Sequence, residues 1–302
     1  MMQACGKHWD VTQRSLYVVS KAFVKVVNID IHLAACCLRR RVFCSCARRP
    51  TGSICSAVAD ASIALPSKIS RYLTPINSQN PDLVWENGVV GSRLLVVSWL
   101  DDAGKYYKCS VASGCSGNTT CVEGGECPTY KYDSWVTVVP EIKNFFATTP
   151  PEPLRIAQLL GLPPEAAIAG NPTAYTYMLE MWVSPTDLFR PCPDTEISDT
   201  VCEIGFPVDS FRTPDLTNMV RATEGPDYGV FMTYPDWFNN RSRYIYTGSN
   251  PYPWTRLGYT YDWGSSNHVG LSEFVLHGRK VDGSTISVGI RSVKTTAEYF
   301  LK

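Results

Sequence analysis

A short segment near the C-terminus, residues 254–276, carries the densest set of side chains capable of chemistry. It reads WTRLGYTYDWGSSNHVGLSEFVL and mixes large rings with charged groups. An ordinary core seldom contains so many polar groups, because each one needs a partner when it is buried. Pockets that bind a small polar molecule often do contain them. The candidate residues are Arg256, Tyr259, Tyr261, Asp262, Trp263, His268 and Glu273.

Glu273, Arg256 and His268 are the candidate catalytic residues of this segment. Glu273 precedes an apolar stretch, so a strand there would direct its carboxylate from a sheet edge into a cleft. Arg256 could hold a phosphate or a carboxylate through two parallel hydrogen bonds. A carboxylate, a guanidinium and stacking rings suit the cleavage of an N-glycosidic bond. Rings that could stack on a base or a sugar are supplied by Tyr259, Tyr261 and Trp263.

Other kinds of chemistry find weaker support. The chain has no G-x-S-x-G, no phosphate-binding loop and no G-x-G-x-x-G after a strand. His268 and His277 lack a third matching ligand, so no metal site is expected. One alternative is a metal-independent ribonuclease with Glu273 as base, His268 as acid and Arg256 on the phosphate. Another is a non-catalytic, disulfide-stabilised binding domain in which the aromatic segment is core and Arg256 pairs with Asp262.

The end of the chain resembles a known enzyme family over about thirty residues. The pattern SEFVL…G…ISVGIRSV resembles the last two strands of mono-ADP-ribosyltransferase toxins, where a catalytic glutamate precedes an apolar strand. PW…G…GLSEF also resembles NAD glycohydrolase toxins, which usually carry Gln at the corresponding place. The chain departs from the first family in having Leu271 where many members have Glu or Gln, and in lacking a Ser-Thr-Ser strand. Arg190 is the only arginine in the right order to match the family's first-strand arginine.

The resemblance implies an enzyme that cleaves NAD and either transfers or hydrolyses the ADP-ribose. Glu273 matches the catalytic glutamate, and it would stabilise the ribosyl cation. Arg256 or Arg190 would hold the phosphates. NAD would be a substrate and no cofactor would be bound, so the expected partner is a small nucleotide; no protein partner is indicated.

The cysteines predict disulfides in an oxidising compartment. Of twelve, six lie in short loops rich in Gly, Ser and Pro, in an even number. The sequons at Asn118 and Asn240 agree with secretion and glycosylation, although no clear signal peptide is present. Pairing within the first four is left open. The candidates are Cys109, Cys115, Cys121 and Cys127, followed by Cys192 and Cys202.

Charge divides the chain unevenly. Residues 1–50 carry nine Lys and Arg against two Asp, about +7, so the remainder carries about −7. A mildly acidic body disfavours broad nucleic-acid binding, which needs a basic face. No apolar run of eighteen residues is present, so no membrane span is expected. Residues 1–65 are therefore interpreted as a basic, Cys-rich extension, a targeting segment or a part outside the mature fold, with small residues around 57–61 as a cleavage region.

Residues 66–302 are predicted to form a single α+β domain with a mainly antiparallel sheet, short helices and a disulfide-closed insertion at 109–127. Residues 66–81 are expected to be a linker or extended lead-in. Glu180, inside one apolar stretch, either faces outward or is a buried acid with a partner. The expected strands are 93–100, 105–111, 135–139, 175–183, 273–276 and 285–293, and the expected helices are 140–146, 154–162, 213–223 and 235–245.

Overall fold

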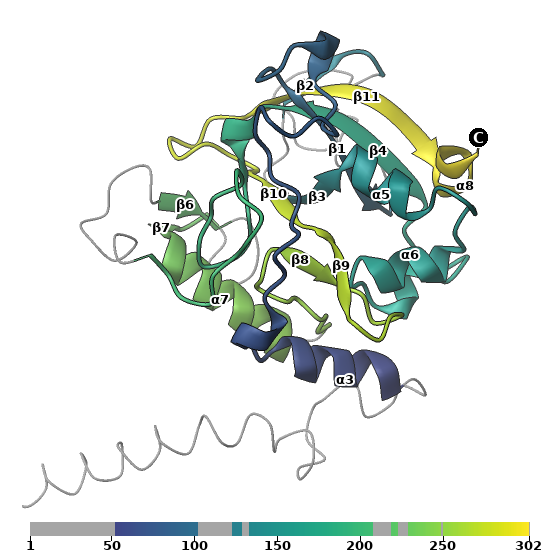
Figure 1. The fold of residues 1–302 in the computed structure, drawn as a ribbon, viewed down its shortest axis with the longest axis vertical. Helices are drawn as coiled ribbons and strands as arrows, with labels where there is room; N and C mark the ends of the chain where they lie inside the picture. The colour runs from purple at the N-terminus through teal and green to yellow at the C-terminus, as the bar shows by residue number, and fades with distance from the viewer. Residues whose placement is uncertain are drawn as a thin grey trace, which may run out of the picture. The chain divides into compact units, whose positions relative to one another are not determined.

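The computed structural model describes residues 52–101, 123–128, 133–207, 219–222, 229–248 and 250–301 (Figure 1). The chain divides into two compact units, residues 1–50 and 51–302, and every described residue belongs to the second. Helix α3 (Gly52–Ala61) therefore lies in the same unit as the sheet. The folded unit begins earlier than the predicted boundary at residue 65.

The predicted α+β class with a mainly antiparallel sheet is confirmed. Among the described residues the main sheet has seven strands, and every neighbouring pair is antiparallel. In sheet order the strands are β2 (Glu126–Pro128), β11 (Ser287–Thr295), β4 (Tyr177–Val183), β1 (Leu94–Leu100), β3 (Ser134–Val138), β10 (Phe274–Leu276) and β5 (Leu188–Phe189).

The central strand β1 is apolar on both faces because both faces of the sheet are covered. Leu94 and Val96 enter one core, whereas Leu95 and Val97 enter another, as the alternation of a strand requires. The second core is closed by three short helices, α5 (Val139–Phe145), α6 (Pro153–Leu159) and α8 (Thr296–Phe300). Pro140 and Pro153 stand in the first turns of α5 and α6, where a missing N–H costs nothing.

The lead-in at 66–81 packs against the first core through Ile76, and it is followed there by Leu83 and Trp85. Four short helical turns lie in this region and in the loops beyond it. They are the short 3₁₀ helices η2 (Pro66–Lys68), η3 (Glu86–Gly88), η5 (Pro164–Ala167) and η6 (Pro185–Asp187). The lead-in is therefore part of the folded unit.

Helix α7 (Tyr234–Thr247) confirms the predicted helix at 235–245. It begins after Thr233, whose side chain accepts a hydrogen bond from the backbone N–H of Asp236. The predicted helix at 213–223 is wrong in its described part. Residues Met219–Arg221 form strand β6, which pairs with β7 (Phe231–Thr233), and residues 213–218 lie outside the described residues. Pairing with β7 outweighs the helix-start pattern there.

A separate hairpin carries the segment that the sequence singled out. Strand β8 (Tyr259–Tyr261) pairs with β9 (Val269–Ser272), and β9 leads through Glu273 directly into β10. The backbone N–H of Glu273 donates to the oxygen of Gly258 at 2.9 Å. Glu273 thus stands where the chain passes from the small hairpin to the main sheet.

The predicted disulfide Cys192–Cys202 is present, and it closes a loop with a sequence separation of 10. Cys127 is also disulfide-bonded. The other members of the predicted quartet, Cys109, Cys115 and Cys121, lie outside the described residues, as do the strand predicted at 105–111 and the sequon at Asn118. No helix in the described ranges is long and apolar enough to cross a membrane.

Glu180 is a buried acid with partners. It is 6 % exposed in β4, its Oε1 accepts from Lys143 Nζ at 2.8 Å, and its Oε2 accepts from Ser292 Oγ at 3.0 Å. Although burial raises the pKa of this carboxyl, the hydrogen bond and charge of Lys143 outweigh it and leave the pKa below its usual value. The outward-facing alternative is excluded.

Candidate functional site

A cavity of about 640 Å³ lies on the helix-covered face of the sheet, between β3, α7 and the segment that follows α7. This volume is typical of pockets that hold a small organic molecule, about 300–1,000 Å³. Its walls combine rings with a few polar groups. The residues that give it this chemistry are Trp135, Arg241, Tyr244, Tyr252, Trp254 and Glu273.

Glu273 is the buried acid of this cavity, whose lining also includes Asp101 and Asp133. Its side chain is 9 % exposed, and its Oε2 atom has no hydrogen-bond partner among the described residues. Burial raises the pKa of Glu273 to about 8, and the Trp254 indole and the Arg241 charge offset only part of that rise. The indole N–H of Trp254 does not itself meet normal hydrogen-bond geometry. At neutral pH this carboxyl is therefore mostly neutral.

Arg241 supplies the positive charge of the cavity. It comes from α7, and its guanidinium carbon lies 5.5 Å from the centre of the Trp135 ring. Trp135 in turn meets Trp254 edge to face, with 5.7 Å between ring centres. Contact of this kind between a guanidinium and a ring is attractive and fixes the position of the guanidinium over the ring. The cavity thus offers an acid and a cation between aromatic walls.

The backbone next to Glu273 is fixed by α5 and by the lead-in. Glu141 Oε1 accepts from both the N–H and the Oγ of Ser272, at 2.8 and 3.0 Å. The Oγ of Ser272 accepts from the backbone N–H of Thr74 at 2.7 Å. Burial raises the pKa of Glu141, and the two bonds from Ser272 act against that rise. These contacts hold the residue before Glu273, and so they hold Glu273 in the cavity wall.

Of the residues predicted for the site, the structure places Glu273 and Tyr261 in the lining of this cavity. Tyr261 serves a second purpose, because its hydroxyl donates to Asp60 Oδ2 in α3 at 3.0 Å. Tyr259 is buried and donates to the backbone oxygen of Lys68 at 2.8 Å. Its burial raises its pKa to about 12.

Arg256 does not join Glu273 in this lining. Its Nη2 atom donates to the backbone oxygen of Ser62 at 2.6 Å, and its guanidinium carbon lies 5.4 Å from the centre of the Tyr246 ring. Its backbone has a φ of 60°, which a residue other than glycine rarely adopts. Arg256, Tyr259 and Tyr261 each donate a hydrogen bond to the segment 52–68, which begins with α3. These bonds attach that segment to the β8–β9 hairpin.

His268 and Trp263 also stand outside the lining. His268 stacks on Tyr261 with 4.7 Å between ring centres, and its Nδ1 lies 3.2 Å from the backbone oxygen of Asp262. Trp263 donates from Nε1 to the oxygen of Leu162 at 3.0 Å. The ribonuclease alternative needs His268 and Glu273 in one cavity, and this arrangement does not provide it.

Arg190 is fully buried in the described structure, and it is not among the residues that line the Glu273 cavity. Its exposed fraction is 0 %, and burial lowers the pKa of its guanidinium. The guanidinium carbon lies 5.2 Å from the centre of the Phe274 ring. Its Nε and Nη2 atoms donate at 2.9–3.3 Å to the backbone oxygens of Thr74, Glu196, Ile197 and Asp199. Arg190 therefore joins the lead-in to the loop closed by Cys192–Cys202.

Asp262 pairs with Arg155 of α6, and the pairing with Arg256 expected for a purely structural segment is absent. Arg155 donates to both carboxylate oxygens of Asp262, at 2.9 and 2.6 Å. The backbone N–H of Gly264 donates to Oδ1 at 2.9 Å. This pair ties the β8–β9 hairpin to α6.

We expect Arg155→Met to lower the free energy of unfolding by about 2–3 kcal/mol. Asp262, which is 1 % exposed, would remain buried without its cation, and the partial exposure of Arg155 lets water replace only some of the lost bonds. Urea unfolding would measure the change, with the exposed Arg243→Met as the matched control. Equal midpoints for both variants would contradict the importance of this pair.

Among the described residues, no group of three or more His, Cys, Asp or Glu is arranged to hold a metal ion. His277 is largely buried against Phe189, with 4.6 Å between ring centres, and burial lowers its pKa to about 4.

Comparison with known proteins gives no further guide to this site. No protein-family model matches the chain, and neither the curated proteins nor the solved structures yield a significant match.

Sequence reasoning missed Arg241, Trp135 and Glu141. Arg241 could have been linked to Tyr244, because residues three apart in a helix such as α7 lie on one face of it. The register of β3 on β10, which sets Trp135 opposite Val275, brings Trp135 beside the Glu273 strand. Nothing in the sequence signals that pairing, because the two strands are more than a hundred residues apart.

Proposed function

We propose that the Glu273 cavity binds NAD and cleaves its nicotinamide–ribose bond, in an oxidising compartment outside the cytosol. The observation that carries this proposal is a buried carboxyl with an unpartnered oxygen, placed beside a guanidinium between aromatic walls. The resemblance around Glu273 supports the choice of NAD. The disulfide Cys192–Cys202 supports the choice of compartment.

The charge of the substrate explains why a mostly neutral acid suits this reaction. The nicotinamide ring of NAD is a cation, and a nearby positive charge favours the ionised form of a carboxyl. Substrate binding would therefore lower the pKa of Glu273 and produce the carboxylate where it is needed. Aromatic walls such as Trp135 and Trp254 favour a flat cationic ring in addition.

The reaction would proceed by loss of nicotinamide. The carbon–nitrogen bond breaks, its electron pair stays on the nicotinamide nitrogen, and an oxocarbenium-like ribose develops beside the Glu273 carboxylate. Water, or a hydroxyl or amine of a target, then bonds to that carbon, and the proton that it loses passes to the Glu273 carboxylate or to solvent water. Arg241 takes the phosphate-binding role that the sequence assigned to Arg256 or Arg190, because it is the arginine in this lining.

We expect purified protein to release nicotinamide from NAD, and we expect Glu273→Gln to lower the rate at least a hundredfold, roughly the loss seen for an essential charge in an active site. Liquid chromatography of the reaction would measure nicotinamide directly. Arg241→Met should raise KM more than it lowers kcat, since it would mainly bind phosphate.

One control variant and one failure criterion complete this test. Arg256→Met removes an arginine outside the lining, so it should leave KM for NAD unchanged in protein that is still folded. The proposal fails if wild-type protein releases nicotinamide no faster than Glu273→Gln does. The non-catalytic binding domain is then the better description.

A further inference from the structure

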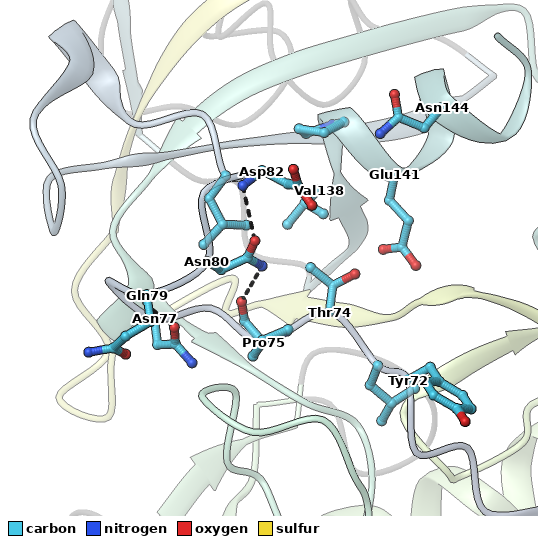
Figure 2. A pocket seen from close by; sticks show the side chains of 13 residues that line it. Tyr72, Thr74, Pro75, Asn77, Gln79, Asn80, Asp82, Val138, Glu141 and Asn144 are labelled. Carbon is cyan, nitrogen blue, oxygen red and sulfur yellow. Dashed lines mark hydrogen bonds between the residues drawn. The ribbon is translucent and has the colours of Figure 1, made fainter.

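A second cavity, of about 490 Å³, lies where residues 72–83 pass the start of α5 (Figure 2). It shares no lining residue with the Glu273 cavity. Figure 2 shows the Glu141 side chain directed from α5 toward Thr74 and Tyr72 on the opposite wall. The volume lies within the range of small-molecule pockets, about 300–1,000 Å³.

The wall formed by residues 72–83 is held in place before any ligand arrives. Thr74 is bonded to Ser272 through its N–H, and its oxygen accepts from Arg190 at 3.3 Å. Asn80 Nδ2 donates to the oxygen of Pro75 at 2.8 Å, and its Oδ1 accepts from the N–H of Asp82 at 3.1 Å (Figure 2). A wall fixed in this way needs little ordering when a ligand binds.

The side chains that line this cavity include both hydrogen-bond donors and hydrogen-bond acceptors. Gln79, Asp82 and Asn144 line it, and their side chains make no hydrogen bond with the described residues. Glu141 also lines it: its Oε1 accepts from Ser272, its Oε2 accepts from Thr137 Oγ1 at 3.4 Å, and the Thr74 side chain is a further donor to this carboxyl. A carboxylate has about four lone-pair sites, so Glu141 can accept from a ligand as well. The lining contains two carboxylates and no Lys, Arg or His, which disfavours an anionic ligand.

A large exposed ring completes the lining. Tyr72 is 93 % exposed at this cavity, although a tyrosine ring in water gains nothing from exposure. This lining matches a molecule with many hydroxyl groups on a compact ring. The carboxamides can donate and accept hydrogen bonds, the carboxylates can accept them, and the tyrosine ring can cover an apolar face. An ammonium ligand would use the acceptors alone and leave the carboxamide donors unpaired.

We propose that the cavity between residues 72–83 and α5 binds a neutral sugar, with Tyr72 against the ring face and with Gln79, Asp82, Glu141 and Asn144 on the hydroxyl groups. This site is independent of the NAD proposal, because it shares no residue with the Glu273 cavity.

Titration calorimetry and ligand-observed NMR on the full chain would test the proposal with glucose, galactose, mannose, N-acetylglucosamine and their β-linked disaccharides. Spermidine and inorganic phosphate would serve as the cationic and anionic comparisons. We expect saturable binding of at least one sugar, and we expect Asn144→Ala and Tyr72→Ala each to weaken it about tenfold, the loss of one good contact.

Asn239→Ala is the matched control, since Asn239 is an exposed carboxamide in α7 that lines neither cavity, and it should leave binding unchanged. Asn144 and Tyr72 are exposed, so their variants should fold normally, as circular dichroism would verify. Binding of no sugar, preference for spermidine or phosphate, or sugar binding that survives both variants would each overturn the proposal.

Discussion

The substitution Glu273→Gln is expected to make the protein more stable at pH 8 and to remove a large part of its pH dependence. Glu273 has a pKa of about 8 in the folded protein, against an ordinary value of 4.5. Each unit of difference corresponds to about 1.4 kcal/mol, so ionising this buried carboxyl costs a few kcal/mol. Glutamine has nearly the same shape and no charge, so it removes that cost.

The direction of the effect follows from which state holds the proton. Between about pH 4.5 and pH 8 the folded protein keeps the Glu273 proton, whereas the unfolded chain has released it. Stability therefore falls as pH rises through this window, and it is constant above it as far as this group is concerned. The difference between Glu273→Gln and wild type should grow from pH 4.5 to pH 8.

Denaturant unfolding at half-unit pH steps would measure this difference. Glu180→Gln is a matched control of opposite sign, because Lys143 holds the pKa of Glu180 below its usual value despite burial. That variant should be less stable than wild type at neutral pH and should approach it in acid. A Glu273→Gln curve parallel to wild type from pH 5 to pH 8 would mean that this carboxyl reaches water.

The substitution Arg190→Met is expected to lower the free energy of unfolding by at least about 3 kcal/mol. Methionine would fill much of the space beside Phe274, but the four backbone oxygens that Arg190 serves would lose their donor inside the protein. Two segments, the lead-in and the loop closed by Cys192–Cys202, would be held less firmly as a result.

The same variant separates a structural role from a substrate-binding one. Thermal and urea unfolding of Arg190→Met would be compared with the exposed Arg71→Met, which should change stability by less than about 0.5 kcal/mol. If Arg190 contacted substrate, the variant would keep its stability and show a raised KM for NAD. The structure predicts the reverse, a loss of stability with KM unchanged in the protein that remains folded.

Much of the fold could be predicted because its signals are local. Residues 94–100 are apolar except for Ser98, as a strand covered on both faces requires, and β1 is found there. Pro140 at the start of α5, the helical spacing of apolar residues within 154–162 and Pro235-Asp236 at the start of α7 located these helices within a few residues. At 219–221 the helix signal came from residues outside the described range, and the partner β7 decided the local structure.

The site could be predicted only in part, because its partners are set by tertiary contacts. Glu273 was found from its own neighbours, since an acid before an apolar strand is a local pattern. Its neighbour Arg241 lies in another element and was missed, while Arg256 lay closer in sequence and was chosen. A partly or fully buried arginine needs hydrogen-bond acceptors, but the sequence does not show whether these acceptors are backbone oxygens, as that of Ser62 is for Arg256, or atoms of a ligand.

Residues 52–68 are hydrogen-bonded to the β8–β9 hairpin, and these bonds restrict where the chain can be shortened. A protein that started after residue 65 would lack Asp60 and the carbonyl of Ser62, so the hydroxyl of Tyr261 and the guanidinium of Arg256 would lose the acceptors they now have. Tyr261 also forms part of the Glu273 cavity. Proteolysis around residues 57–61 would thus loosen a wall of that cavity from outside, without touching any group inside it.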